Sequence, residues 1–159
     1  MTIQFLDSRI SIHSNDFGGS TPVTDLPLMV GDIGLQVVAA NPLNTSNVRV
    51  SLSGTVFVDF APPPTGEPTV PVSQTIAISV ERGGDGGAGT GVQILNQQFF
   101  IVPGHPLYPI SVTAADFPPA ADVLTGQIRY VMYVATDGGV DLVLAGPAVF
   151  NGLAAAGTT

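Results

Sequence analysis

The sequence predicts an all-β protein, folded as a two-sheet antiparallel β-sandwich with jelly-roll topology. Its 19 glycines and 14 prolines separate short runs rich in Val, Ile and Thr, a pattern typical of strands and turns. Residues 47–60 alternate apolar and polar side chains, as a half-buried antiparallel strand does. The proline-rich stretch at 61–71 suits a long crossing between two sheets. A crossing of that kind favours a jelly roll over an up-and-down barrel.

The chain is expected to divide into an extended N-terminal arm, residues 1–27, and a jelly-roll domain, residues 28–159. Within the arm, residues 3–6 and 9–13 form two short extended pieces, and a polar, turn-rich stretch follows them. An arm of this composition is able to reach a neighbouring copy of the chain.

From residue 28 onward the pattern predicts eight main strands. A Gly-Asp-Ile-Gly turn is expected at 31–34, and the first strand of the domain after it, at 35–39. The next strands are expected at residues 47–60, 72–81, 92–102 and 108–114.

Residues 126–153 predict a long β-hairpin with its turn at 136–139. Both faces of its arms are apolar, whereas an antiparallel sandwich strand needs only one apolar face. The second face therefore requires a partner, and we expect that partner to be another copy of the chain. The residues expected at this subunit interface are Phe57, Val131, Tyr133 and Val143.

Charge is scarce along the chain. Charged residues make up 10% of the sequence, lysine is absent and the net charge is −8. So little charge indicates that much of the surface is covered by partners. The acidic balance argues against binding to nucleic acid or to anionic lipid. No apolar run is long enough for membrane insertion.

The N-terminal residues also lack the basic and apolar regions of a Sec signal peptide. A location outside the cell is therefore expected to follow cytoplasmic synthesis without a cleaved signal peptide.

No catalytic residues and no cofactor are expected, because nothing in the sequence marks a reactive group. Asp85 and Asp137, in glycine-rich stretches, are weak candidates for Ca²⁺ ligands. The more favoured interpretation of both stretches is a tight or mobile turn. The glycine-rich loop at 83–91 lacks the lysine and following helix of a phosphate site. A hydrolase would have to rely on His105.

The ending GPAVFNGL, residues 146–153, resembles the closing strand of C1q/TNF-like jelly rolls. The low-charge texture, rich in Gly, Ala, Val and Thr, is similar to jelly-roll proteins of bacterial spore surfaces, in exosporium layers and endospore appendages. The chain departs from these proteins because it lacks the cysteines of many appendage subunits and the collagen-like Gly-X-Y stalk. The resemblance implies homotrimers, or a fibre joined by the N-terminal arm, and no catalytic residues.

The expected function is therefore that of a structural, self-assembling protein of a spore or cell surface layer or fibre. The expected partners are further copies of the chain and other surface-layer proteins. The alternative is a carbohydrate- or ligand-binding jelly roll with exposed aromatic side chains on a concave face. The tyrosines available for that role are Tyr108, Tyr130 and Tyr133.

Overall fold

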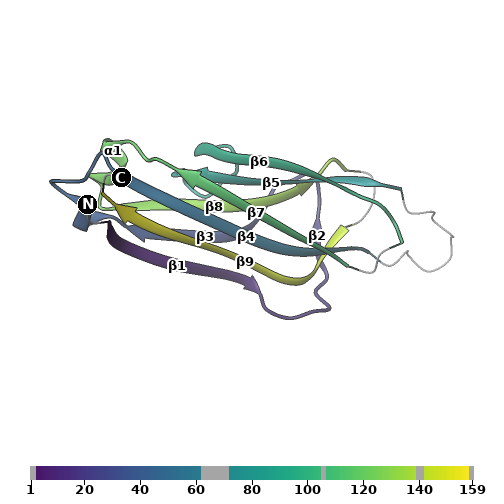
Figure 1. Ribbon diagram of the computed structural model, residues 1–159. Helices are drawn as coiled ribbons and strands as arrows, with labels where there is room; N and C mark the ends of the chain where they lie inside the picture. The colour runs from purple at the N-terminus through teal and green to yellow at the C-terminus, as the bar shows by residue number, and fades with distance from the viewer. Residues whose placement is uncertain (1–2, 62–71, 105–106, 139–141, 158–159) are drawn as a thin grey trace.

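A computed structural model describes residues 3–61, 72–104, 107–138 and 142–157 (Figure 1). Within these ranges the chain forms nine strands, a 3-10 turn (η1, Val38–Ala40) and a short helix (α1, Ala120–Val123). The described part of the chain contains no helix that is long and apolar enough to cross a membrane. The strands are β1 Gln4–Ser14, β2 Thr21–Val23, β3 Leu28–Gln36, β4 Val48–Phe60, β5 Gln74–Arg82, β6 Val92–Ile101, β7 Tyr108–Asp116, β8 Gln127–Thr136 and β9 Leu142–Ala156.

The strands form two antiparallel sheets that pack as a sandwich. The first sheet has the order β1-β9-β4-β7, with the short β2 also paired to β9, and the second has the order β3-β8-β5-β6. The pairs are nested along the chain: β5 with β6, β4 with β7, β3 with β8 and β1 with β9. This nesting is a long hairpin rolled into two sheets, which is the jelly roll. The predicted fold class is confirmed; the finer C1q/TNF-like assignment stays a prediction.

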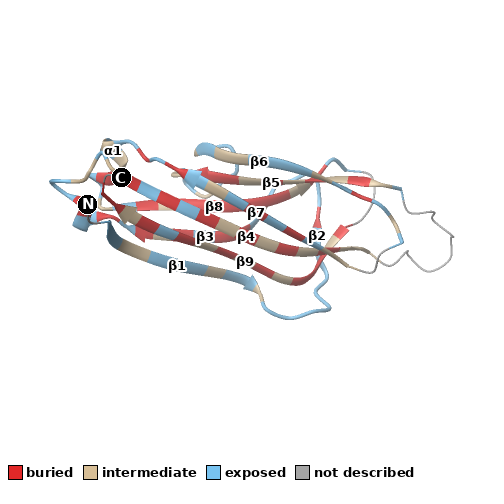
Figure 2. Cartoon of the chain, in the orientation of Figure 1, coloured by how far each residue is buried: buried red, intermediate tan, exposed pale blue. Residues whose placement is uncertain are grey.

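The core lies between the two sheets, and β4 shows how the sequence builds it. Its inward side chains are at most 2% exposed, while the residues between them reach solvent (Figure 2). The inward residues are Val48, Val50, Leu52, Val56 and Val58. Gly54 occupies the remaining inward position, where an added Cβ would lie 2.2 Å from the sulfur of Met132 on the opposite sheet. A glycine here lets the sheets approach closely.

The turn predicted at residues 31–34 is wrong, because these residues lie inside β3. At Gly31 an added Cβ would come within 2.3 Å of the Cβ of Phe150, which crosses the core from β9. The glycine therefore marks a close approach of two sheets and not a change of chain direction. The strand predicted at 35–39 is likewise wrong from Val37, because β3 ends at Gln36 and the 3-10 turn begins at Val38.

Within the predicted arm, Gln4–Ser14 forms β1, which pairs with β9 over nine aligned residue pairs. β1 also protects the free edge of β3 with its side chains. The Gln36 N–H donates to Asp7 Oδ2 at 2.9 Å, and the Asp32 N–H donates to Ser11 Oγ at 3.1 Å.

Counting β1 corrects the predicted strand number. From Leu28 onward the described residues contain seven strands, not the expected eight, and β1 is the eighth main strand of the jelly roll. The division of the chain at residue 27 into an arm and a domain stays a prediction.

The predicted hairpin at 126–153 is also wrong, because its two arms belong to opposite sheets (Figure 1). β8 lies between β3 and β5, and β9 lies between β1 and β4. Of the predicted turn at 136–139, residue 139 lies outside the described residues. Each of the two strands is flanked by a neighbouring strand on both edges.

Candidate functional site

Val131 and Tyr133, on the outer face of the second sheet, are only 1% and 3% exposed in a single chain. Their neighbours in β8, Tyr130 and Met132, point the other way into the core between the sheets. The premise that a second copy must cover Val131 and Tyr133 is therefore wrong. Other parts of the same chain already bury them.

The glycine-rich loop, residues 83–91, is tied to this outer face at the end of β5. Glu81 aligns with Val131 on the neighbouring strand, and its carboxylate accepts two backbone N–H groups of the loop. The Gly89 N–H donates to Oε1 at 2.7 Å and the Gly91 N–H to Oε2 at 3.0 Å. Glu81 itself is 6% exposed, so the loop closes over it.

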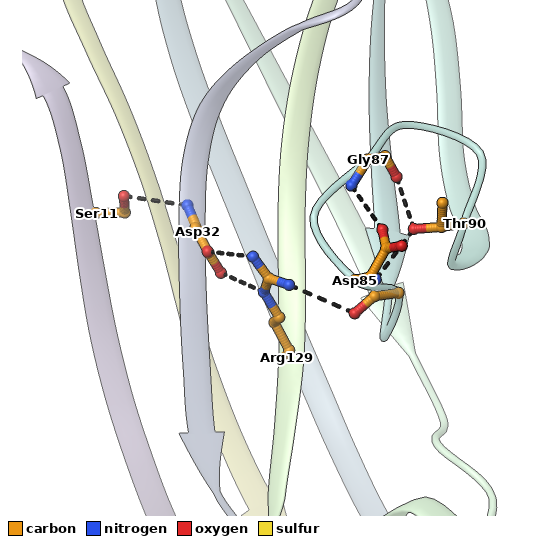
Figure 3. Close-up of polar contacts among 7 residues, drawn as sticks. Ser11, Asp32, Asp85, Gly87, Thr90 and Arg129 are labelled. Atoms are coloured by element: carbon orange, nitrogen blue, oxygen red, sulfur yellow. Dashed lines mark hydrogen bonds and ion pairs between the residues drawn. The ribbon is translucent and has the colours of Figure 1, made fainter.

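Arg129 provides the second anchor of the glycine-rich loop (Figure 3). Its guanidinium binds the Asp32 carboxylate of β3 in a fork, with Nε–Oδ1 at 2.9 Å and Nη2–Oδ2 at 2.6 Å. Its Nη1 donates to the Gly84 carbonyl oxygen at 3.4 Å. The bond to Asp32 is the main reason why the pKa of Arg129 is raised. Val131 is aligned with Asp32 on β3 and with Glu81 on β5, so it lies between the two carboxylates that hold Arg129 and the loop.

Phe57 and Val143 lie on the other sheet, and both are half-buried. Phe57 packs edge-on against Phe17, with ring centroids 5.6 Å apart. Val143 is aligned with Pro22 of β2 on one side and with Asp59 of β4 on the other. The segment before β3 therefore covers part of both residues, and their role in a subunit interface stays a prediction.

The two candidate Ca²⁺ ligands do not converge. Asp85 accepts the Gly87 N–H at 2.9 Å inside the glycine-rich loop, and this backbone bond is the first cause of its lowered pKa (Figure 3). Asp137 accepts the Thr75 N–H at 3.3 Å, at the opposite end of β5. The described residues contain no group of three His, Cys, Asp or Glu that would hold a metal ion. The Asp85 carboxylate is bound within its own loop, whereas the Asp137 carboxylate is bound to the start of β5.

The tyrosines of the carbohydrate-binding alternative offer little surface. Tyr130 is fully buried, Tyr133 is nearly so, and Tyr108 is half-buried with its ring edge-on to Phe60, at 6.4 Å between centroids. Stacking on a sugar requires an exposed aromatic face, which Tyr130 and Tyr133 do not present. His105, on which a hydrolase would rely, lies outside the described residues.

A buried charged network closes one end of the sandwich. Arg82 Nη1 donates to both carboxylate oxygens of Asp116, at 2.8 and 2.7 Å, and the Tyr130 hydroxyl donates to Asp116 Oδ2 at 2.8 Å. Arg82 Nε lies 2.9 Å from Asp122 Oδ2, but the N–H is not aligned for a hydrogen bond, so this contact is an ion pair.

Burial and charge act together on this network. Burial alone would lower the pKa of Arg82, but the bond to Asp116 and the attraction of the two carboxylates raise it. Burial, and then the bond to Asp116, raise the pKa of Tyr130.

A shallow groove of about 450 Å³ borders the network beside the glycine-rich loop. The two arginines that line this groove, Arg82 and Arg129, are both already bound to carboxylates, so the groove offers no free charge for a ligand.

One apolar surface that a single chain leaves uncovered lies on β1 and β9, along the outer face of the first sheet. Phe5, Ile10 and Ile12 are 62%, 65% and 52% exposed, and Leu153 of β9 is 44% exposed. We call these four residues the β1–β9 apolar surface. Ser8 pairs with Leu153, and Ile10 pairs with Asn151, the next outward residue of β9. The four side chains therefore lie on adjacent strands and point to the same face of the sheet.

Sequence reasoning missed this surface, although the alternation of Ile10 and Ile12 was a visible signal. The rest of the same face, on β4 and β7, is mostly polar, with Ser and Thr side chains beside Arg49, Asp59 and the half-buried Phe57 of β4. Two side-chain hydrogen bonds cross it, Ser53 to Asn151 and Thr55 with Ser111. The outer face of the first sheet is thus divided into an apolar half and a polar half.

No protein-family model and no curated protein matches this chain. Among solved structures, the T13 particle of infectious bursal disease virus matches 94% of this chain and 35% of that chain, at 10% identity and TM-score 0.45. The Gt strain structure of the same virus matches 95% of this chain and 37% of that chain, at 10% identity and TM-score 0.45.

This chain therefore spans just over a third of those proteins. The TM-scores are too low to carry an argument, so the fold rests on the strand pairing itself. The neighbours come from a virus, and the spore-surface family stays a prediction.

Proposed function

We propose that this chain is a structural, self-assembling β-sandwich protein whose copies contact one another through the β1–β9 apolar surface. The observation that carries the proposal is the set of four large apolar side chains, each 44% to 65% exposed, on two adjacent strands. Burying a side chain of this size contributes about 1.5–3 kcal/mol relative to leaving it in water. A surface of this kind is typical of protein contacts.

The absence of charged residues from this surface supports a second copy of the chain as the partner. The outward residues of β1 and β9 that align across this surface carry no charge: Phe5, Ser8, Ile10, Ile12, Val149, Asn151, Leu153 and Ala155. Two copies can therefore bring these faces together without burying an unpaired charge. The low charge of the whole chain, 10% of residues, agrees with a surface that is largely covered.

The finer parts of the proposal are a trimer and a place in a spore or cell surface layer or fibre. They are supported by the resemblance of residues 146–153 and of the overall composition to spore-surface jelly rolls. The carbohydrate-binding alternative loses support from the burial of Tyr130 and Tyr133.

The test compares the wild-type chain with Ile10→Lys by sedimentation velocity and negative-stain microscopy. Ile10 is 65% exposed, so lysine should leave the fold intact while placing a charge in the contact. The matched control is Thr113→Lys, an exposed position on the polar half of the same face. We expect assemblies for the wild type and Thr113→Lys, and their loss for Ile10→Lys. A wild-type mass of one chain at micromolar concentration would contradict the proposal.

A further inference from the structure

The two edge strands of the second sheet, β3 and β6, differ in whether other residues cover their outer backbone groups. The β3 edge is capped by Asp7 and Ser11 of β1, as described above. The opposite edge is β6, at the margin of the sandwich (Figure 1). Within the described ranges, β5 is the only strand that pairs with β6. The other side of β6 therefore presents a row of backbone N–H and C=O groups to solvent.

β6 also lacks the features that protect natural edge strands. Charged side chains and prolines normally block the approach of another strand, and residues 92–102 contain neither. Large apolar groups are exposed along it instead: Phe100 is 71% exposed and Val92 is 55% exposed. An edge of this length and composition is suited to pairing with another strand.

The sequence of β6 is symmetric in chemical character. Residues 94–100 are Ile-Leu-Asn-Gln-Gln-Phe-Phe, which is two apolar residues, three amides and two apolar residues. The centre of this symmetry is Gln97, which is exposed. An antiparallel strand that is symmetric about one residue is complementary to a second copy of itself.

Pairing about a two-fold axis at Gln97 matches each residue of 94–100 with one of the same character. Leu95 comes opposite Phe99, Asn96 opposite Gln98, and Gln97 opposite its own copy. Leu95, Gln97 and Phe99 align with the core residues of β5, so the two inner faces join in register. Apolar pairs and amide pairs across strands each stabilise a sheet.

We propose that β6 of one copy pairs antiparallel with β6 of a second copy about this axis, which joins two four-stranded sheets into one continuous sheet. The proposal rests on the proposed self-assembly and adds a second, separate contact, because β6 and β1 are edge strands of different sheets. A two-fold contact alone closes a pair. Together with the β1–β9 apolar surface, it links pairs into an extended assembly.

The first test uses the absence of cysteine from the natural sequence. In Gln97→Cys, the two-fold axis places each new thiol opposite its own copy. Aligned Cα atoms of an antiparallel pair are about 4.5–5.5 Å apart, within the range of a disulfide. Mild oxidation is therefore expected to convert the chain into covalent dimers. Thr113→Cys, exposed on the other sheet, is the control and should remain mostly uncrosslinked.

The second test uses charge. Gln97→Lys and Gln97→Glu each place like charges face to face, so each variant alone should lose the two-fold pair. An equimolar mixture of the two variants should regain it, because lysine then faces glutamate. Both variants should keep the native circular dichroism spectrum, because Gln97 is exposed. Sedimentation equilibrium of each variant and of the mixture measures the loss and the recovery.

The outcomes separate the two contacts. The β6 proposal is overturned if Gln97→Cys cross-links no more than Thr113→Cys, or if mixing the charged variants restores nothing. If Ile10→Lys abolishes the large assemblies while Gln97→Cys still cross-links within that variant, both contacts are supported as independent. If Ile10→Lys abolishes the assemblies while no Gln97 variant cross-links or changes the mass, the proposed function stands and the β6 contact fails.

Discussion

Asp116 is the residue whose replacement most directly tests the energetics of the fold. Its two carboxylate oxygens accept three hydrogen bonds, two from Arg82 and one from the Tyr130 hydroxyl. The side chains of Arg82 and Asp116 are only 12% and 9% exposed, so water screens the pair little. Asp116→Asn preserves the size of the side chain but removes the charge that balances Arg82.

Removing one partner of a buried ion pair typically costs about 3–5 kcal/mol. The lower end of this energy range applies to Asp116→Asn, because Asp122 still attracts the Arg82 guanidinium. That attraction is weakened by solvent, since the Asp122 side chain is 41% exposed. We expect the free energy of unfolding to fall by about 3 kcal/mol. For a domain of this size that corresponds to a Tm lower by about 6–12 °C.

The matched control is Asp32→Asn, which removes the carboxylate from the more exposed pair with Arg129. The side chains of that pair are 33% and 40% exposed, so its loss should cost less than about 1 kcal/mol. Urea denaturation of the wild type and both variants measures the difference, with the slope of unfolding checked for constancy. Equal costs for the two variants would refute the reasoning that burial makes the Asp116 pair the stronger one.

Two further predictions follow from residues described above. Val131→Lys should destabilise the single chain by about 2 kcal/mol or more, because the position is 1% exposed, and thermal unfolding at concentrations too low for assembly measures this. An unchanged Tm would restore Val131 as a free interface residue. Burial acts to raise the pKa of Asp7, but the Gln36 N–H and then Arg9 lower it below its ordinary value of 3.8. The stabilising contribution of Asp7 is therefore complete above pH 3.8 and is lost as the pH falls through the lowered pKa. Hydrogen exchange at the Gln36 amide should accelerate in that acid range, and an Asp7→Asn variant that keeps the same pH dependence would contradict the assignment.

The sequence was most informative where one strand has one buried face. The strand predicted at 47–60 is β4, Val48–Phe60, because its strict alternation reports directly on a sheet with a single apolar side. The strands predicted at 92–102 and 108–114 likewise correspond to β6 and β7 within two residues at each end. The sandwich class follows from such strands and from the turns between them.

Strand partners were not predictable in the same way. A Thr-Asp-Gly-Gly stretch between two apolar strands is typical of a hairpin, yet here the chain passes from β8 in one sheet to β9 in the other. Local turn chemistry does not distinguish a return within one sheet from a crossing between two. Gly31 was misleading for a related reason, since its role depends on Phe150, far away in sequence.

The candidate site was only partly predictable. The exposed row Ile10 and Ile12 is visible in the sequence, but its importance depends on β1 being held at the edge of the first sheet by β9. The cover over Val131 was not visible, because it depends on the anchoring of a glycine-rich loop by Glu81 and Arg129. Loop positions of this kind follow from tertiary contacts and not from periodicity.

The nested pairing of the strands has a consequence for the order of folding. β5 and β6 are joined by one short loop, whereas β1 pairs with β9 from Gln4 to Ala156, close to both ends of the sequence. Contacts between distant residues form slowly, because a long loop must close before they stabilise anything. β9 is central in its sheet, so β1 has no strand beside it until residues 142–156 have joined. The β1–β9 apolar surface therefore does not exist until β9 has joined its sheet and β1 has joined β9, so assembly through this surface follows those late contacts.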